Sequence, residues 1–480
     1  MTPDHEPINS TPHLQTSIEG SGYRPQQIRR IDQGATILHH PDEILGLALS
    51  FLGAGQFGFI APVCSRFKYV YLTTVSDEKI TNGECITSSI SRAEKYLEAA
   101  GSDTKKIAFF WYSAARYSRL EVMEWAHQRG YSHVWEERRN DWYATIADNV
   151  VETTCRIATE YGQLTVLKWL HRNGCHLNCR TCSIAAAGGH LSCLQWAREV
   201  GCDWNAFVCS AAAEGGHIIC LKWARENGCD WNSRTCELAA RAGHLSCLQW
   251  ARDNGCNWTG RTCEAAARGG HLFCLQWSRE KGCDWTANTC LAAAEGGHFS
   301  CLEWARENRC PWDYRTCLAA AEGGHLSILQ WAREKGCDWQ SCACAAAAGG
   351  GYLTMLQWLR ANGCPWDHKT CATAAKGGHL TVLKWARENG CDWKGSTCAS
   401  AASEGHLSVL QWARDNGCPW TSSTCYYAAG GGHLSCLQWA RENGCNWSSD
   451  TCYAAARGRH LAVLLWAREN GCDEDVVHCG

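Results

Sequence analysis

The chain has 480 residues, a length that corresponds to about three ordinary domains unless an internal repeat organises it differently. Lys and Arg number 45 against 48 Asp and Glu, and this net charge of −3 gives no electrostatic reason to expect nucleic acid or an anionic membrane as a partner. The first residues contain no apolar signal segment, and no uninterrupted apolar run reaches about 18 residues. We therefore expect protein partners, no membrane contact, and a cytoplasmic location with the nucleus as the alternative, where thiols stay reduced.

Residues 1–34 contain few apolar side chains and are predicted to form a disordered tail. From Pro41 onward, apolar residues recur at helical spacing in two sets separated by Gly53–Gln56. This pattern predicts a small helical segment over residues 35–75. In the simplest interpretation the segment caps one end of the repeats that follow, because an uncapped end repeat exposes apolar surface.

The same segment resembles the F-box. That family runs Leu-Pro-x-Glu-Ile/Leu-Leu, Ile-Leu-Ser-x-Leu and Val-Cys-x-x-Trp, with His40 and Phe67 here in place of its first Leu and its Trp. The resemblance implies docking to the adaptor subunit of a cullin–RING ubiquitin ligase. The residues to which it assigns this contact are Pro41, Ile44, Leu45, Leu49, Leu52, Val63, Cys64 and Phe67.

Residues 76–153 are predicted to hold degenerate first repeats. Segment 91–101 is similar to the longer helix of the later unit, and segment 107–115 to its shorter helix. Two positions that mark successive units, Arg119 and Gln163, stand 44 residues apart instead of 27. About 17 extra residues are therefore predicted near 134–150.

From residue 154 to 480 one unit recurs every 27 residues, and its marker is a histidine that follows a glycine pair in most units, with Tyr352 in one unit. An unbroken period of this length is typical of a solenoid in which each unit packs on its neighbours. The marker histidines are His190, His217, His244, His271, His298, His325, His379, His406, His433 and His460.

Each unit is predicted to form two helices. The longer one, seen in HLSCLQWAREN at 433–443, has its apolar residues at helical spacing and ends at Asn443-Gly444. The shorter one is predicted to start with Thr424 as N-cap and to end at the glycines before His433. At about eight residues it is too short to be stable alone, so we expect its alanines to pack closely on neighbouring helices.

The motif AAxxGH, followed by a helix and NGCDWN, resembles the ankyrin repeat, whose pattern is AAxxGHLxVVxLLLxxGADVN. The resemblance covers residues 113–480 and implies an all-α solenoid of helix-turn-helix repeats that binds proteins, preceded by the small F-box-like domain. The unit is shorter than the ankyrin unit of about 33 residues. The missing residues fall in the loop that carries a β-hairpin in that family.

The 35 cysteines fall mainly in three columns of the unit: thirteen at the start of the shorter helix, twelve after the turn that ends the longer helix, and six within the longer helix. Other units have Val, Ile or Met in the third column, as at Val166, and a metal ligand could not be exchanged in this way. The first two columns stand at C-x₆-C spacing, wider than the pairs of structural zinc sites. We expect buried thiols, no disulfide framework, and no metal or other cofactor; a metal array is the alternative.

The marker histidine is replaced by Tyr352, Gln163 and Arg119 in other units, which argues against a catalytic or metal-binding role. We expect its imidazole to bond backbone groups of its own or the next repeat. The two tryptophans of each unit, such as Trp196 and Trp204, are predicted to stack as ladders in the core, with an aromatic ligand groove as the alternative.

The sequence contains no phosphate-binding Gly-rich loop, no G-x-S-x-G and no HExxH, so we expect no enzymatic activity. The expected function is a substrate-recruiting adaptor of a cullin–RING ubiquitin ligase. The alternative is a non-enzymatic ankyrin-type binding scaffold without a ligase link.

Client binding is predicted where units differ, at the second residue of the shorter helix and at the residue before the glycine pair; equally, these are solvated positions free to drift. Three tyrosines in two adjacent units stand out, because Tyr is common among binding hot spots. The predicted client-binding residues are Glu237, Glu264, Tyr426, Tyr427, Tyr453, Arg241 and Arg268.

Overall fold

The computed structural model describes residues 83–135 and 150–472. All regular elements in these ranges are helices, and their repeated pairwise packing gives the predicted all-α solenoid. In the same ranges every helix falls short of the length and apolarity that crossing a membrane requires. The predicted tail, the F-box-like segment with its eight assigned residues, and most of the predicted insertion lie outside the described residues.

The N-terminal part of the described chain contains α4 (Gly83–Ile86), α5 (Ile90–Ala100), α6 (Thr104–Arg116), α7 (Leu120–Gln128) and the 3₁₀ helix η2 (Tyr131–Trp135). Helices thus occur at both predicted segments, 91–101 and 107–115. The centre of this part is formed by fully buried large side chains, which include Leu97, Phe110 and Trp111. Helix α6 also packs on α8, the first helix after the undescribed segment.

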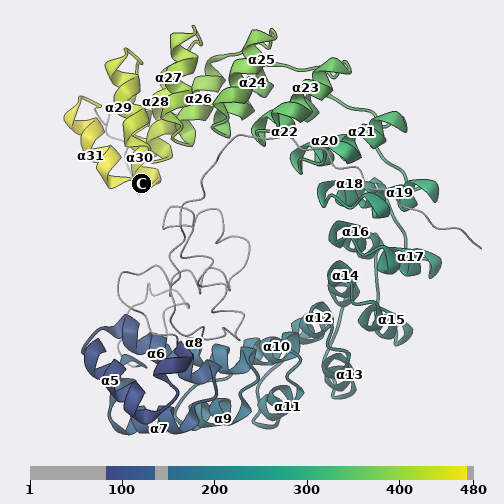
Figure 1. Ribbon diagram of the computed structural model, residues 1–480, viewed down its shortest axis with the longest axis vertical. Coiled ribbons are helices and arrows are strands. Elements are labelled where there is room, and N and C mark those ends of the chain that lie inside the picture. Colours follow the sequence, from purple (N-terminus) through teal and green to yellow (C-terminus); the bar gives the residue numbers. More distant parts are fainter. Residues whose placement is uncertain (1–82, 136–149, 473–480) are drawn as a thin grey trace, which may run out of the picture. The chain divides into compact units, whose positions relative to one another are not determined.

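The regular array consists of helix pairs, and in Figure 1 the even-numbered helices lie along the inner side of the stack and the odd-numbered ones along the outer side. The inner helices are α8 (Val150–Glu160), α10 (Cys179–Ala187), α12 (Ala206–Glu214), α14 (Ser233–Ala242), α16 (Gly260–Gly269), α18 (Ala287–Glu295), α20 (Tyr314–Glu322), α22 (Ser341–Gly349), α24 (His368–Lys376), α26 (Gly395–Ser403), α28 (Ser422–Gly430) and α30 (Ser449–Arg457). The outer helices are α9 (Leu164–Arg172), α11 (Leu191–Glu199), α13 (Ile218–Glu226), α15 (Leu245–Asp253), α17 (Leu272–Glu280), α19 (Phe299–Glu307), α21 (Leu326–Glu334), α23 (Leu353–Ala361), α25 (Leu380–Glu388), α27 (Leu407–Asp415), α29 (Leu434–Glu442) and α31 (Leu461–Glu469).

Inner helices pack tightly on one another, whereas successive outer helices touch much less. The cause lies in side-chain size. Inner helices bury small residues, as α14 does with Cys236, Ala239 and Ala240, and small side chains let helix backbones approach closely. The outer helices bury larger residues such as Leu248 and are held apart.

The predicted N-cap of the inner helix was wrong. Helix α28 begins at Ser422, so Thr424 lies in its first turn and is fully buried. The N-cap position is taken three residues earlier, as by Asn232, whose side chain accepts a hydrogen bond of 3.0 Å from the backbone N–H of Arg234. The two helices of a unit consequently have nearly equal lengths, against the prediction of a short and a long one.

Marker histidines join a repeat to the preceding one through a ring-to-carbonyl bond, which is present at His190, His325, His379, His433 and His460. The Nε2 atom of His190 lies 2.8 Å from the carbonyl oxygen of Glu160, at the end of the preceding inner helix. Where glutamine replaces histidine, the Gln163 amide donates to the carbonyl of Arg116 at 3.0 Å and makes the same connection. The predicted backbone bond is therefore present, and its partner belongs to the previous repeat.

A glycine makes room for each of these rings. Gly270 has φ +75°, a left-handed conformation that glycine adopts without strain, and a Cβ there would stand 2.4 Å from Nδ1 of His298 in the next repeat. A glycine before a marker thus serves both its own turn and the neighbour's histidine, which explains why the two recur together. Before the last marker, His460, Arg459 takes this place at φ +59°.

We predict that Gly270→Ala lowers the free energy of unfolding by roughly 2–4 kcal/mol, because it adds overpacking against the His298 ring to the strain of a left-handed alanine. The matched control is Gly282→Ala, at φ +81° with nothing within 4 Å of the added Cβ. It should cost only about 1 kcal/mol of backbone strain. Urea denaturation of both variants measures the difference, and equal losses would contradict the proposed ring contact.

His271 should make the stability of the array depend on pH. Burial, aided by the neighbouring His298 and His244, lowers the pKa of His271 below its ordinary value of 6.5. Below pH 6.5 the His271 side chain binds a proton more readily in the unfolded chain than in the folded chain. The free energy of unfolding is therefore highest above pH 6.5 and decreases as the pH falls toward the lower pKa of the folded state.

We therefore expect the melting temperature to fall when pH is lowered from about 7.5 to about 5.5, and to fall less in His271→Gln. Glutamine is the matched replacement because Gln163 makes the same inter-repeat bond. Circular dichroism melts of both chains provide the measurement. An equal drop in the two proteins would assign the pH dependence to other groups.

Candidate interaction surface

The tryptophan columns form ladders at the rim of the core rather than inside it. Trp204, in the loop after α11, meets Trp223 of the next outer helix edge-to-face, with ring centroids 5.7 Å apart. Both rings are half-buried. The predicted ring contacts are present as one edge-to-face pair between neighbouring repeats, but the rings are half-buried and not enclosed in the core.

An arginine covers each loop tryptophan. The guanidinium carbon of Arg198 lies 4.6 Å from the Trp204 ring centroid, and its Nη1 donates to the carbonyl of Cys202 at 3.0 Å. A cation–π contact of this kind occupies the ring face that an aromatic ligand would need. A shallow hollow of about 610 Å³ occurs at two such loops, and there too Arg333 lies over Trp339. The ladder therefore serves to hold repeats together.

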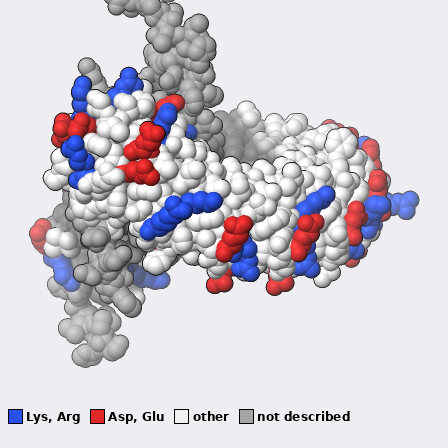
Figure 2. All heavy atoms as spheres, turned by 90° about the horizontal axis from the view of Figure 1, so that it is seen from below, with Lys and Arg blue, Asp and Glu red and all other residues white. Residues whose placement is uncertain are grey.

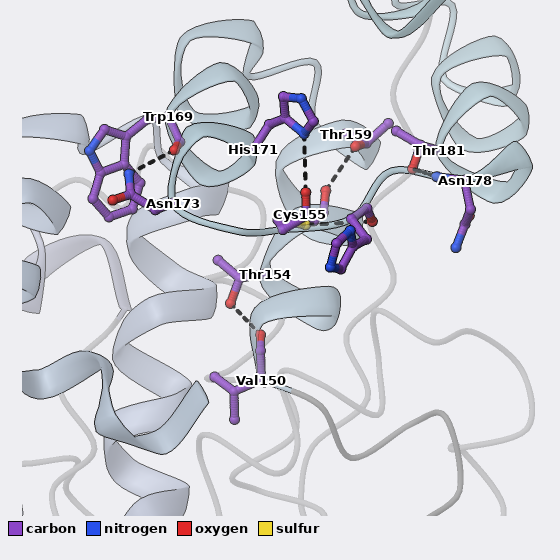
Figure 3. The surroundings of a disulfide bond; sticks show 11 residues. Val150, Thr154, Cys155, Thr159, Trp169, His171, Asn173, Asn178 and Thr181 are labelled. Carbon is purple, nitrogen blue, oxygen red and sulfur yellow. Dashed lines mark hydrogen bonds between the residues drawn. A yellow bond between two sulfur atoms is a disulfide. The ribbon is translucent and has the colours of Figure 1, made fainter. Parts of the chain in front are cut away.

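The two uniform cysteine columns meet inside each repeat. The nearest partner is 20 residues away across the helix pair, as for Cys182 and Cys202, whose sulfurs are 3.4 Å apart. The sequence predicted buried thiols without a disulfide framework, and one pair departs from this, since Cys155 and Cys175 are bonded (Figure 3). In the described ranges no group of three or more His, Cys, Asp or Glu side chains could hold a metal ion.

Three predicted client-binding residues are tyrosines on two adjacent inner helices, and we call them the tyrosine cluster. Tyr427 and Tyr453 are 49% and 51% exposed, on the adjacent helices α28 and α30. Tyr426, which occupies in α28 the position of Tyr453, is half-buried and meets the Tyr427 ring edge-to-face at 5.2 Å. The surface available to a partner therefore lies mainly on Tyr427 and Tyr453.

Of the four charged residues predicted to bind a client, two belong to an ion-pair chain. Arg268 contacts Glu264 of its own helix at 3.3 Å and also pairs with Glu295 of the next inner helix. Glu237 is half-buried and Arg241 exposed. A client would compete with existing partners at Glu264 and Arg268, so these two residues fit a structural role better than a binding one.

Two sets of exposed side chains, one apolar and one cationic, were not predicted from the sequence. Ile219 and Phe273 are 66% and 76% exposed on outer helices, where neighbouring units carry Ser. The sequence contained a signal for them, because each is an apolar residue at a position of the repeat that is Ser in neighbouring units. A cationic residue also recurs two positions before the inner-helix cysteine, and the exposed ones are Arg180, Arg234, Arg261 and Lys369.

No protein-family model and no curated protein sequence matches the chain. Solved structures similar in fold include the pentatricopeptide repeat protein PPR10 in complex with an 18-nt psaJ RNA element, and a variant of it with three cysteine-to-serine substitutions in complex with the same RNA element. Each match has 14% sequence identity and a TM-score of 0.33, and covers 91% of this chain and 74% of the other.

The expectation that nucleic acid is excluded as a partner was wrong, since both of these helical-repeat structures contain RNA. Net charge is a property of the whole chain and hides local groups such as the cationic row on the inner helices. Figure 2 shows acidic and basic side chains intermixed on one face of the molecule, so a total near zero conceals many local charges. The likeness itself is one of fold and does not place RNA on this chain.

Proposed function

We propose that this chain is a non-enzymatic binding scaffold whose inner-helix surface takes a protein client. The inner row is the set of residues that directly follow the inner-helix cysteine, such as Glu237, Glu264, Tyr426 and Tyr453. The proposal rests on the contrast between the nearly constant interior of the stack and this variable row. The buried cysteines, alanines and leucines repeat from unit to unit, whereas the row changes from charged in α14 and α16 to aromatic in α28 and α30. The row can therefore give one part of the stack a different partner from another.

The tyrosine cluster is the part of this row best suited to a protein partner. Tyr427 and Tyr453 together offer apolar area with few rotatable bonds and a hydroxyl for hydrogen bonding, a combination common in protein-binding hot spots. No basic side chain belongs to the cluster itself, which favours a protein over a polyanion at this place.

At a finer level, we propose that the units are ankyrin-like. The helix pair, the left-handed glycine before the marker histidine and the N-capped inner helix follow the resemblance. In the described ranges the loops that join units form no strands, so binding cannot use the protruding hairpins of that family there. Client contact is left to the helices.

We further propose that the segment over 35–75 is an F-box that docks the repeats to a cullin–RING ubiquitin ligase, making the chain a substrate-recruiting adaptor. The support is the sequence resemblance at Leu45, Leu49 and the other assigned residues. The alternative is a scaffold of the same kind without a ligase link.

We expect replacement of Tyr426, Tyr427 and Tyr453 by Ala to weaken client capture by at least about tenfold, the effect of losing a hot spot, with little change in melting temperature. The control is the double change Ile219→Ala and Phe273→Ala, which removes exposed apolar surface from the outer helices. Affinity capture followed by mass spectrometry, with and without ribonuclease, identifies the proteins affected.

The client proposal stands if proteins retained after ribonuclease treatment are lost from the tyrosine variant and kept by the control. Equal loss from both variants would indicate nonspecific apolar adhesion. Capture that disappears with ribonuclease would assign the surface to RNA instead. A large drop in melting temperature would place the tyrosines in the core.

The ligase link predicts that Leu45→Asp with Leu49→Asp abolishes binding to the purified ligase adaptor, because a charge on this stripe would be buried in the contact. The repeats should keep their helical circular dichroism, and the tyrosine variant should still bind the adaptor. Absence of adaptor binding by the unmodified chain would leave the scaffold without a ligase link.

A further inference from the structure

The cysteines at the start of the inner helix and in the loop after the outer helix form a pair in twelve successive repeats, always 20 residues apart. Both members of every pair are buried, with at most 5% of the residue exposed. The first pair is Cys155–Cys175 and the last is Cys452–Cys472. The outer-helix cysteine column has Val, Ile or Met in other units, so a small apolar side chain is enough there. The two paired columns are Cys in all twelve units, which indicates a requirement for the thiols themselves.

The sulfurs of the second pair are in contact. Cys182 donates its S–H to the sulfur of Cys202 at 3.4 Å, and Cys202 can donate to the carbonyl of Asn178, the N-cap of the same inner helix, at 2.9 Å. In nine more repeats a hydrogen bond to the partner thiol raises the pKa of the inner-helix cysteine.

One pair is already covalently joined. Cys155 and Cys175 form a disulfide that ties α8 to the loop after α9. Figure 3 shows its surroundings, where the Thr159 hydroxyl donates to the Cys155 carbonyl at 2.8 Å and the His171 ring lies 3.1 Å from the Cys175 carbonyl. The equivalent cysteines of the next repeat, Cys182 and Cys202, are in contact as thiols.

We propose that these twelve cysteine pairs form a redox ladder, in which each pair is a modification site that a small disulfide oxidises to one disulfide within its repeat. Each closed pair joins the start of an inner helix to the end of the outer-helix loop, so that oxidation fastens a repeat without changing its neighbours.

The chemistry of one step is a double thiol–disulfide exchange. The loop cysteine, Cys202, loses its proton and attacks a sulfur of oxidised glutathione, which breaks that S–S bond and releases one glutathione thiolate. Cys182 then loses its proton and attacks the Cys202 sulfur, which forms the protein disulfide and releases the second glutathione. Two protein thiols are oxidised, one small disulfide is reduced, and the two released thiolates take up the two protons.

The loop cysteine is the better attacking group of the two. It retains 4% exposure where Cys182 has none. The Cys182 S–H bond, helped by the nearby Arg198 guanidinium, also lowers the pKa of the Cys202 thiol. The outer-helix cysteines lack such a partner, and burial raises the pKa of Cys193 to about 11, so they should react far more slowly.

The test starts from the full chain reduced with dithiothreitol and freed of the reductant. It is then incubated with oxidised glutathione across a series of sub-denaturing urea concentrations, which open buried repeats transiently. Iodoacetamide in guanidinium chloride next labels every remaining thiol. We expect intact mass to show labels lost in steps of two, and peptide mapping to show disulfides between cysteines 20 residues apart, with the outer-helix column fully labelled.

Two substitutions sharpen the result. Cys182→Ser should leave Cys202 as a stable mixed disulfide with glutathione while the other pairs close. The matched control is Cys193→Val, since Val166 occupies the same column, and all pairs should close in it. Retention of all thiols at every urea concentration would overturn the ladder. So would links without the 20-residue spacing, or equal oxidation of the outer-helix column.

Discussion

The contact between a histidine ring and a glycine of the preceding repeat is the constraint on which this stack depends. It fixes three things together: the left-handed turn between the helices of one unit, the position of the next unit's ring, and the ring's bond to the last turn of the inner helix behind it. Because the same two residues serve neighbouring repeats, the period cannot drift without breaking both. The glutamine that replaces histidine at residue 163 keeps the backbone bond and so keeps the register.

Around this contact, small side chains set how closely repeats approach. Alanine and cysteine on the inner helices allow tight packing, and the larger outer-helix side chains hold that side apart. The tryptophan–arginine ladder then ties the outer loops. A protein built mainly from nearest-neighbour contacts of this kind has a stability close to a sum over repeats. Chemistry that acts inside a single repeat, such as joining two of its cysteines, can therefore change the stability of part of the stack alone.

The interior and the surface of the array obey different rules. Interior positions are nearly invariant from unit to unit because each must fit the same two neighbours. Inner-row positions such as Glu237, Leu291 and Tyr426 are only half-buried, so this demand is weaker there and they differ between units. This division is what makes a uniform stack useful as a scaffold, since local differences along the row can distinguish partners while the supporting geometry stays the same.

The sequence by itself determined the period, the two helices of each unit, the burial of the cysteines and the backbone role of the histidines. These properties depend on spacing within one helix or on repetition along the chain. Only the tertiary structure decided that a cysteine's partner lies 20 residues away, that Thr424 is buried instead of capping a helix, and that an arginine covers each loop tryptophan. Those outcomes depend on how one helix folds back against another, which sequence spacing does not encode.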